Sequence, residues 1–105
     1  TAEEVIRIIN MVNMEWFGLV LDIGSFSTGD PYEQIKRTIP YAVNWQIKEN
    51  LLVNGKEEKT DLQRLFKIIK DSRYRGFIPI ETLGKGDPKE KVAIFLAEVR
   101  LALNQ

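Results

Sequence analysis

The sequence contains no cysteine and no histidine. Without cysteine, disulfides and thiolate metal sites are excluded, and the redox compartment cannot be read from the sequence. Without histidine, the chain lacks the commonest general base, the Ser–His nucleophile pair and the commonest transition-metal ligand. Any chemistry of this chain must therefore run on carboxylates, amides, hydroxyls and lysine.

The sequence also lacks net charge and long hydrophobic runs. Fifteen basic residues balance fifteen acidic ones, so no net field steers the chain towards nucleic acid or a membrane. No apolar run approaches the roughly 18 residues that span a bilayer, and no signal-peptide pattern opens the chain. We therefore expect a cytoplasmic protein, unless a signal outside this sequence directs it to the periplasm.

The overall composition is that of an ordinary globular domain. The 105 residues allow one domain at most, or a part of a larger one. Apolar residues make up 44% of the chain and charged residues 29%, which are proportions typical of soluble domains. The information about function must therefore lie in local patterns.

The stretch Ala42–Glu49 alternates apolar and polar side chains with period two, which predicts a strand with two different faces. Its apolar face is formed by Val43, Trp45 and Ile47, and its polar face by Asn44, Gln46 and Lys48. Helices are expected to cover the apolar face together with Ile78 and Ile80. Both tryptophans, Trp16 and Trp45, are expected to pack in the core.

Two further apolar stretches, Gly18–Asp22 and Phe77–Glu81, are predicted as strands, and each ends in a carboxylate. The first of these strands is expected to run from about Phe17 to Ile23. If the three strands lie parallel, their carboxyl ends meet at one rim of the sheet. That rim would carry Asp22, Gln46, Lys48 and Glu81.

Helix start signals occur four times along the chain. Thr1-Ala2-Glu3-Glu4 and Thr60-Asp61-Leu62-Gln63 are typical of capping boxes, and Asp30 and Asp87 each open an Asp-Pro-x-Glu start. The first helix is expected to end near Met14. The predicted buried stripes are Val5, Ile8, Ile9 and Val12; Tyr32, Ile35 and Ile39; Leu62, Leu65, Phe66 and Ile69; and Val92, Phe95, Leu96, Val99, Ala102 and Leu103.

The predicted order is a helix followed by three strand–helix units. This order indicates an α/β fold with parallel strands and right-handed helical crossovers. Asn54-Gly55 adds a small hairpin after the central strand, because both residues of a type I′ turn need positive φ. A three-stranded sheet alone has two open edges and one uncovered face. The polar residues of the central strand suit the inside of a barrel, so we expect a closed barrel or self-association through the open edges.

Four motifs in the same order resemble the xylose isomerase-like TIM barrels, a superfamily that includes sugar phosphate isomerases and epimerases. The motifs are Gly18–Phe26, Asp30–Glu33, Tyr41–Glu49 and Tyr74–Glu81. The resemblance covers essentially the whole chain and implies strands six, seven and eight of the barrel. Residues 1–105 would then form a single unit, the C-terminal portion of a (β/α)8 barrel.

The resemblance also implies a divalent metal held by Glu, Asp, His and Glu at the carboxyl ends of the strands. In this resemblance, the family's Asp falls on Asp22 and its His falls on Gln46. The family's last Glu falls on Glu81, and the resemblance implies that this Glu also acts as a catalytic base. The first Glu would lie upstream of Thr1. An amide oxygen suits a hard cation better than zinc, so Mn²⁺ or Mg²⁺ is the favoured cofactor.

Simpler interpretations stand beside these site assignments. Asp22 could serve an Asx-turn, Glu81 could be solvated, and Gln46 could only be hydrogen-bonded. Lys48 is a candidate for binding a substrate phosphate or hydroxyl, with Asn44 beside it, or for pairing with Asp22 or Glu49. Gly84-Lys85-Gly86 is a weak candidate for phosphate binding, because the Asp87 cap puts a negative charge there.

Two functional hypotheses follow. The first is the C-terminal part of a metal-dependent isomerase or epimerase of a sugar or sugar phosphate, inactive until the barrel is complete. The second is a non-catalytic barrel relative that lost its metal with the histidine and serves carbohydrate binding or assembly. A half-barrel that dimerises through its open edges is a third, structural alternative.

Overall fold

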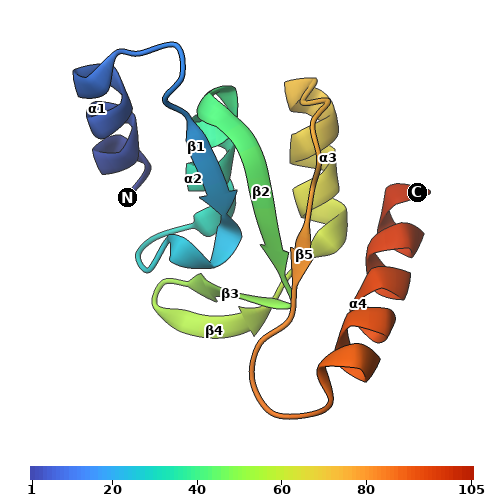
Figure 1. The fold of residues 1–105 in the computed structure, drawn as a ribbon. Coiled ribbons are helices and arrows are strands. Elements are labelled where there is room, and N and C mark those ends of the chain that lie inside the picture. Colours follow the sequence, from blue (N-terminus) through green and yellow to red (C-terminus); the bar gives the residue numbers. More distant parts are fainter.

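The computed structural model describes residues 1–105 and contains three parallel strands, four helices and a hairpin (Figure 1). The helices are α1 (Ala2–Val12), α2 (Pro31–Thr38), α3 (Leu62–Ser72) and α4 (Pro88–Leu103), with short 3-10 turns η1 (Ile23–Ser25) and η2 (Ile39–Tyr41). The strands are β1 (Leu19–Asp22), β2 (Ala42–Lys48), β3 (Asn50–Val53), β4 (Lys56–Lys59) and β5 (Ile80–Glu81). None of the helices is long and apolar enough to cross a membrane.

The main sheet is parallel, with the strand order β1-β2-β5 and the alternating strand β2 at its centre. The predicted fold class is therefore confirmed. Both outer strands are shorter than predicted. β1 ends where the Asp22 side chain caps η1, and β5 pairs over only two residues because Pro79 has no N–H to donate to the ladder. The Pro79 carbonyl still accepts a hydrogen bond of 2.9 Å from the Ile47 amide.

The helices pack in chain order, with α2 against α1 and α3, and α4 against α3 and β5 (Figure 1). Asp30 and Asp87 cap α2 and α4 as predicted, each followed by proline. In α3 the prediction needs correction, because Asp61 is the cap and not Thr60. The Thr60 hydroxyl instead donates a hydrogen bond of 2.7 Å to the Lys48 carbonyl.

The core lies between the sheet and the helices. Trp45 and Ile47 of the central strand are fully buried, and Trp45 packs edge-on against Tyr74 with ring centroids 5.7 Å apart. The predicted stripes of α2 and α3 are confirmed, with Leu62 only half-buried. In α4, Phe95, Val99 and Ala102 are buried, whereas Val92 and Leu103 are exposed.

Helix α1 differs most from its prediction. It begins with the expected capping box but ends at Val12, and Asn13 takes a left-handed conformation with φ 45°. Only Ala2 is buried, whereas Ile8 and Val12 of the predicted stripe are exposed, because the packing of α1 is mainly against the short helix α2. A hydrogen bond of 2.8 Å from the Ala2 amide to Gln34 holds it there.

The predicted burial of Trp16 and of Val43, near the amino ends of the strands, was also wrong. Trp16 is 91% exposed, because it lies in the turn that precedes β1. Val43 is 67% exposed, because the pairing of β1 with β2 shifts there: Leu19 pairs with Ala42, and the next residue, Val20, pairs with Asn44. Val43 is thus the extra residue at this irregularity of the pairing, and no helix covers it.

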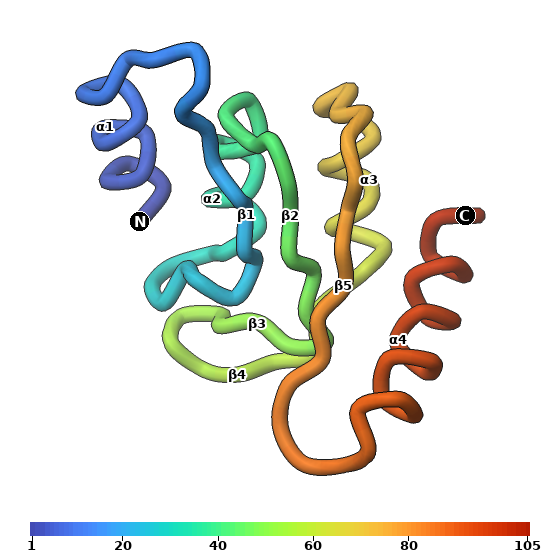
Figure 2. Tube along the Cα trace, viewed as in Figure 1, coloured from blue at the N-terminus to red at the C-terminus, as the bar shows by residue number.

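The Asn54-Gly55 prediction is confirmed. The two residues have φ values of 51° and 79° and join β3 and β4 into an antiparallel hairpin. The chain trace places this hairpin beyond the carboxyl ends of β1 and β2, beside η1 (Figure 2). The hairpin therefore lies next to the rim where the predicted site residues meet.

Candidate functional site at the carboxyl ends of the strands

The three parallel strands bring two carboxylates to one ammonium group. The Lys48 Nζ lies 2.8 Å from Oδ2 of Asp22 and 3.3 Å from Oε2 of Glu81. In the sheet register, Asp22 pairs with Gln46 and Lys48 pairs with Glu81, which puts all four side chains on one face. The predicted rim of Asp22, Gln46, Lys48 and Glu81 is therefore present in the structure.

Asp22 serves two partners at once. Its Oδ1 accepts a hydrogen bond of 2.9 Å from the Gly24 amide and caps the η1 turn, while its Oδ2 faces Lys48. The Asx-turn interpretation and the ion-pair interpretation are thus both correct. Because the cap fixes the carboxylate, Oδ2 is held in place facing Lys48.

Lys48 is the best-fixed charge of the site. Its side chain is only 19% exposed, and its hydrogen bond to Asp22, together with the Glu81 carboxylate, raises its pKa above the ordinary value. Of the two pairing partners predicted from sequence, Asp22 is confirmed, whereas Glu49 instead pairs with Lys91 at 3.4 Å. Lys48 is therefore a protonated cation at neutral pH.

Two positioning residues of Lys48 were missed by the sequence analysis. Thr60 fixes the backbone of Lys48 through its hydroxyl. Gly24 leaves room for the lysine stem, since a Cβ on Gly24 would lie 3.0 Å from Cδ of Lys48. A glycine placed two residues after the strand-end Asp22 was the signal in the sequence that pointed to this close approach.

The side-chain amides of Asn44 and Gln46 on the central strand have different surroundings. Asn44 turns back on its own strand, and its Oδ1 accepts a hydrogen bond of 2.9 Å from the Trp45 amide. Gln46 is half-buried and pairs with Asp22 in the sheet register, two residue pairs further along the strands than Asn44. Gln46 is thus the amide nearer to the carboxylates.

The donor types suit a hard cation, but their arrangement does not form a ready metal site. Asp22 and Glu81 supply carboxylates and Gln46 an amide oxygen, which are the ligands that Mn²⁺ and Mg²⁺ accept. The Lys48 ammonium, however, lies between the two carboxylates. No group of three or more His, Cys, Asp and Glu side chains that could hold a metal occurs in the structure.

The loop after β5 is closed by Lys91. Its ammonium donates to the Leu83 carbonyl and pairs with Glu49, which ties α4 to the ends of β2 and β5. Gly84 and Gly86 take φ values of 87° and 117° in this loop. Asp87 accepts a hydrogen bond of 3.0 Å from the Lys89 amide as the cap of α4, so a carboxylate occupies the helix start that a phosphate would need.

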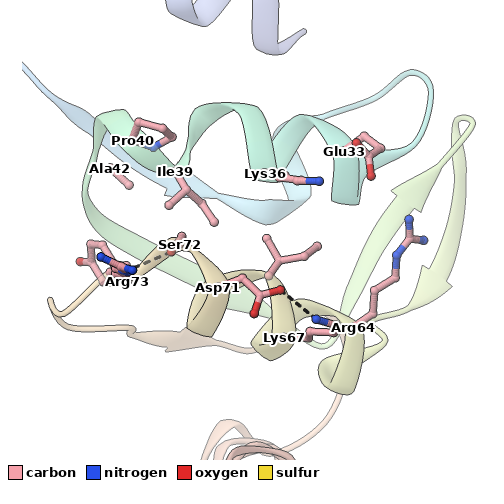
Figure 3. Close-up of a pocket in the computed structure, with 12 residues that line it drawn as sticks. Glu33, Lys36, Ile39, Pro40, Ala42, Arg64, Lys67, Asp71, Ser72 and Arg73 are labelled. Carbon is pink, nitrogen blue, oxygen red and sulfur yellow. Dashed lines mark hydrogen bonds and ion pairs between the residues drawn. The ribbon is translucent and has the colours of Figure 1, made fainter.

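A groove of about 710 Å³ lies elsewhere in the molecule (Figure 3). It runs between α2 and α3, with Lys36 and Glu33 on one side and Lys67 and Asp71, paired at 2.8 Å, on the other. None of the strand-end residues lines it. The convergent charges at the carboxyl ends of the parallel strands, and not this groove, mark the candidate site.

Comparison with known proteins supports the fold. No protein-family model matches the chain, and no curated protein matches it. The crystal structure of a xylose isomerase domain protein from Planctomyces limnophilus matches 97% of this chain, with a TM-score of 0.77 and 19% sequence identity. The chain spans 41% of the length of that structure. The resemblance to the xylose isomerase-like barrels is thus confirmed at the level of the fold.

Proposed function

We propose that this chain forms the last three strand–helix units of a barrel that isomerises or epimerises a sugar or sugar phosphate. The observation that carries this proposal is the convergence of Asp22, Lys48 and Glu81 at the carboxyl ends of three parallel strands. Ligands of parallel α/β folds bind at this end of the strands. The fold match to a protein described as a xylose isomerase domain protein supports sugars as the proposed substrate class.

The three charges suit proton transfer next to a carbonyl group. In the proposed reaction Glu81 removes the proton from the carbon beside the sugar carbonyl, and the electron pair moves to the carbonyl oxygen. The Lys48 ammonium stabilises that developing negative charge by hydrogen bonding. Return of that proton to the former carbonyl carbon gives the isomer, while the hydroxyl proton of the first carbon moves to the former carbonyl oxygen. In the epimer, a water molecule on the Asp22 side gives a proton to the opposite face of the first carbon, and the proton held by Glu81 neutralises the hydroxide that is left.

Metal binding by Asp22, Gln46 and Glu81 stays a prediction. The family resemblance implies Mn²⁺ or Mg²⁺ there, and the carboxylate and amide oxygens are of the right type. A divalent ion would need the position that Lys48 holds between the carboxylates. The proposed reaction therefore uses only the chain's own residues.

Exposed apolar side chains near the amino ends of the strands support a proposed partner. Large apolar side chains are exposed around the amino ends of the strands: Trp16, Phe17, Val20, Val43 and Phe77. Exposed apolar patches of this kind mark interaction surfaces. We propose that the remaining strands of the barrel cover them, or a second copy of the chain where those strands are absent.

Solvent deuterium exchange tests the catalytic proposal in the protein with its whole barrel. Aldoses, ketoses and their phosphates are incubated in D₂O, and NMR follows loss of the C–H signal next to the carbonyl, with and without Mn²⁺. Glu81→Gln is expected to lower the exchange rate at least about 100-fold, since a general base contributes that much. Glu58→Gln on the exposed strand β4 is the matched control and should leave the rate unchanged. Equal rates in both variants would contradict the assignment of Glu81.

A non-catalytic carbohydrate-binding relative is the second candidate. The specific observation in its favour is that Lys48 already neutralises carboxylates on both outer strands, while Gln46 takes the place of the family histidine. The same experiment separates the two candidates. Sugar binding seen in NMR titration without any deuterium exchange would favour the binding role over the isomerase.

A further inference from the structure

We infer that the Lys48 ammonium is the resident cation of this carboxylate site, and that a divalent cation binds there only by displacing it. The inference concerns the site of the proposed function and rests on it for the ligand set. It does not rest on turnover. Its test reads which cation occupies the site, so the inference and the proposed reaction can fail separately.

The ion pairs with the two strands that flank β2 support this assignment. One nitrogen lies within 3.3 Å of carboxylate oxygens from β1 and β5, the two strands that flank β2. A single cation on the central strand thereby joins all three strands at their carboxyl ends. A divalent cation held by Asp22 and Glu81 would meet the ammonium there, so we expect the two cations to exclude each other.

The surroundings hold the ammonium in that place. Gly24 leaves the space that the lysine stem fills, with a Cβ position 3.4 Å from Nζ, and the η1 cap fixes Asp22. Thr60, which is buried, fixes the Lys48 carbonyl. The raised pKa of Lys48 agrees with this geometry, because it reflects the favourable pairing with Asp22 and Glu81.

The charges of the site favour lysine over a divalent ion. Asp22 and Glu81 carry two negative charges and Lys48 one positive charge, so a divalent ion beside Lys48 would meet like-charge repulsion at short range. Gln46 adds only a neutral amide and does not compensate for the repulsion. Removing the lysine charge should therefore uncover a cation site that the wild-type protein keeps closed.

Manganese titration tests the inference, with Mn²⁺ alone as the probe. Calorimetry and the EPR signal of free Mn²⁺ give the affinity of the wild type, Lys48→Met, Lys48→Gln and Lys59→Met. Lys59 pairs with Glu98 at an exposed position and is the matched control. Both Lys48 variants are expected to bind Mn²⁺ at least about tenfold more tightly than the wild type, and Lys59→Met like the wild type.

A second substitution locates the bound ion. Adding Asp22→Asn to Lys48→Met should abolish the gain, because the ion is expected on Asp22. Circular dichroism verifies that each variant is folded. Equal Mn²⁺ affinity of the wild type and both Lys48 variants, including no binding by any of them at millimolar Mn²⁺, would overturn the inference. A gain that survives Asp22→Asn would overturn it as well.

Discussion

Replacing Lys48 by methionine is expected to destabilise the protein by about 2 kcal/mol. The value follows from how far the three charged side chains are exposed. The side chains of Lys48, Asp22 and Glu81 are 19%, 23% and 36% exposed. Exposed ion pairs contribute about 0–1 kcal/mol, whereas removing one partner of a buried pair costs about 3–5 kcal/mol, so this site falls between the two cases.

Methionine keeps most of the apolar stem of lysine, so the substitution removes the charge and little packing. What remains is two carboxylates facing each other without a cation between them. A loss of about 2 kcal/mol corresponds to a decrease of about 10 °C in the melting temperature of a domain of this size. Urea unfolding followed by far-UV circular dichroism measures the free energy of unfolding directly.

Lys59→Met provides the control for a general effect of losing one lysine. Lys59 pairs with Glu98 at 2.9 Å, but the two side chains are 69% and 38% exposed. Its removal should cost less than about 0.5 kcal/mol. If Lys48→Met is no more destabilising than Lys59→Met, the strand-end ion pairs contribute nothing to stability and the argument for a fixed ammonium fails.

The pH dependence of the difference between wild type and Lys48→Met gives an independent check. The partners raise the pKa of Lys48 in the folded state above the ordinary value of 10.5. The stability from this pairing is therefore fully present below pH 10.5 and is lost as the pH rises through the folded-state value. The difference in unfolding free energy should be constant from pH 7 to 9, within about 0.5 kcal/mol, and shrink above pH 10.5. A difference that grows at high pH would contradict the pairing.

Three further predictions concern the space around Lys48, the hairpin and the uncovered face. Gly24→Ala should lower the unfolding free energy by about 1 kcal/mol, because the added Cβ would lie 3.0 Å from Cδ of Lys48; unchanged urea unfolding would show that this contact is loose. Gly55→Ala should cost about 1 kcal/mol in thermal melting, because φ is 79° there, and an unchanged melting temperature would refute the strained turn. Sedimentation velocity should show self-association of the 105-residue chain that Phe77→Ser with Val43→Ser reduces. A wild-type chain that stays monomeric would contradict the need for a covered face.

Local chemistry in the sequence was sufficient to predict most of the elements. The helix starts at Asp30 and Asp87 depend on contacts within one turn, and the Asn54-Gly55 hairpin on the φ values of two residues. The period-two pattern of the central strand separated its buried from its polar face. These features could be predicted because they depend on neighbours close in the chain.

The errors occur where burial depends on distant elements. Helix α1 has the spacing of a buried stripe, yet it packs mainly against the short helix α2 and buries only Ala2. Val43 continues the alternation of its strand, but it lies where the pairing with β1 shifts and is exposed. Periodicity indicates which side chains share a face, and it does not indicate whether another element covers that face.

The sequence by itself determined which groups could take part in chemistry: without cysteine or histidine, only carboxylates, amides, hydroxyls and lysine remain, and the strand ends supply Asp22, Gln46, Lys48 and Glu81. The tertiary structure decided how they are paired. Lys48 and Glu49 are neighbours in the sequence. The parallel pairing of β2 with β1 and β5 nevertheless directs the Lys48 ammonium to Asp22 and Glu81. Strand register fixes which charges meet, because side chains on adjacent strands lie closer in space than those on opposite faces of one strand.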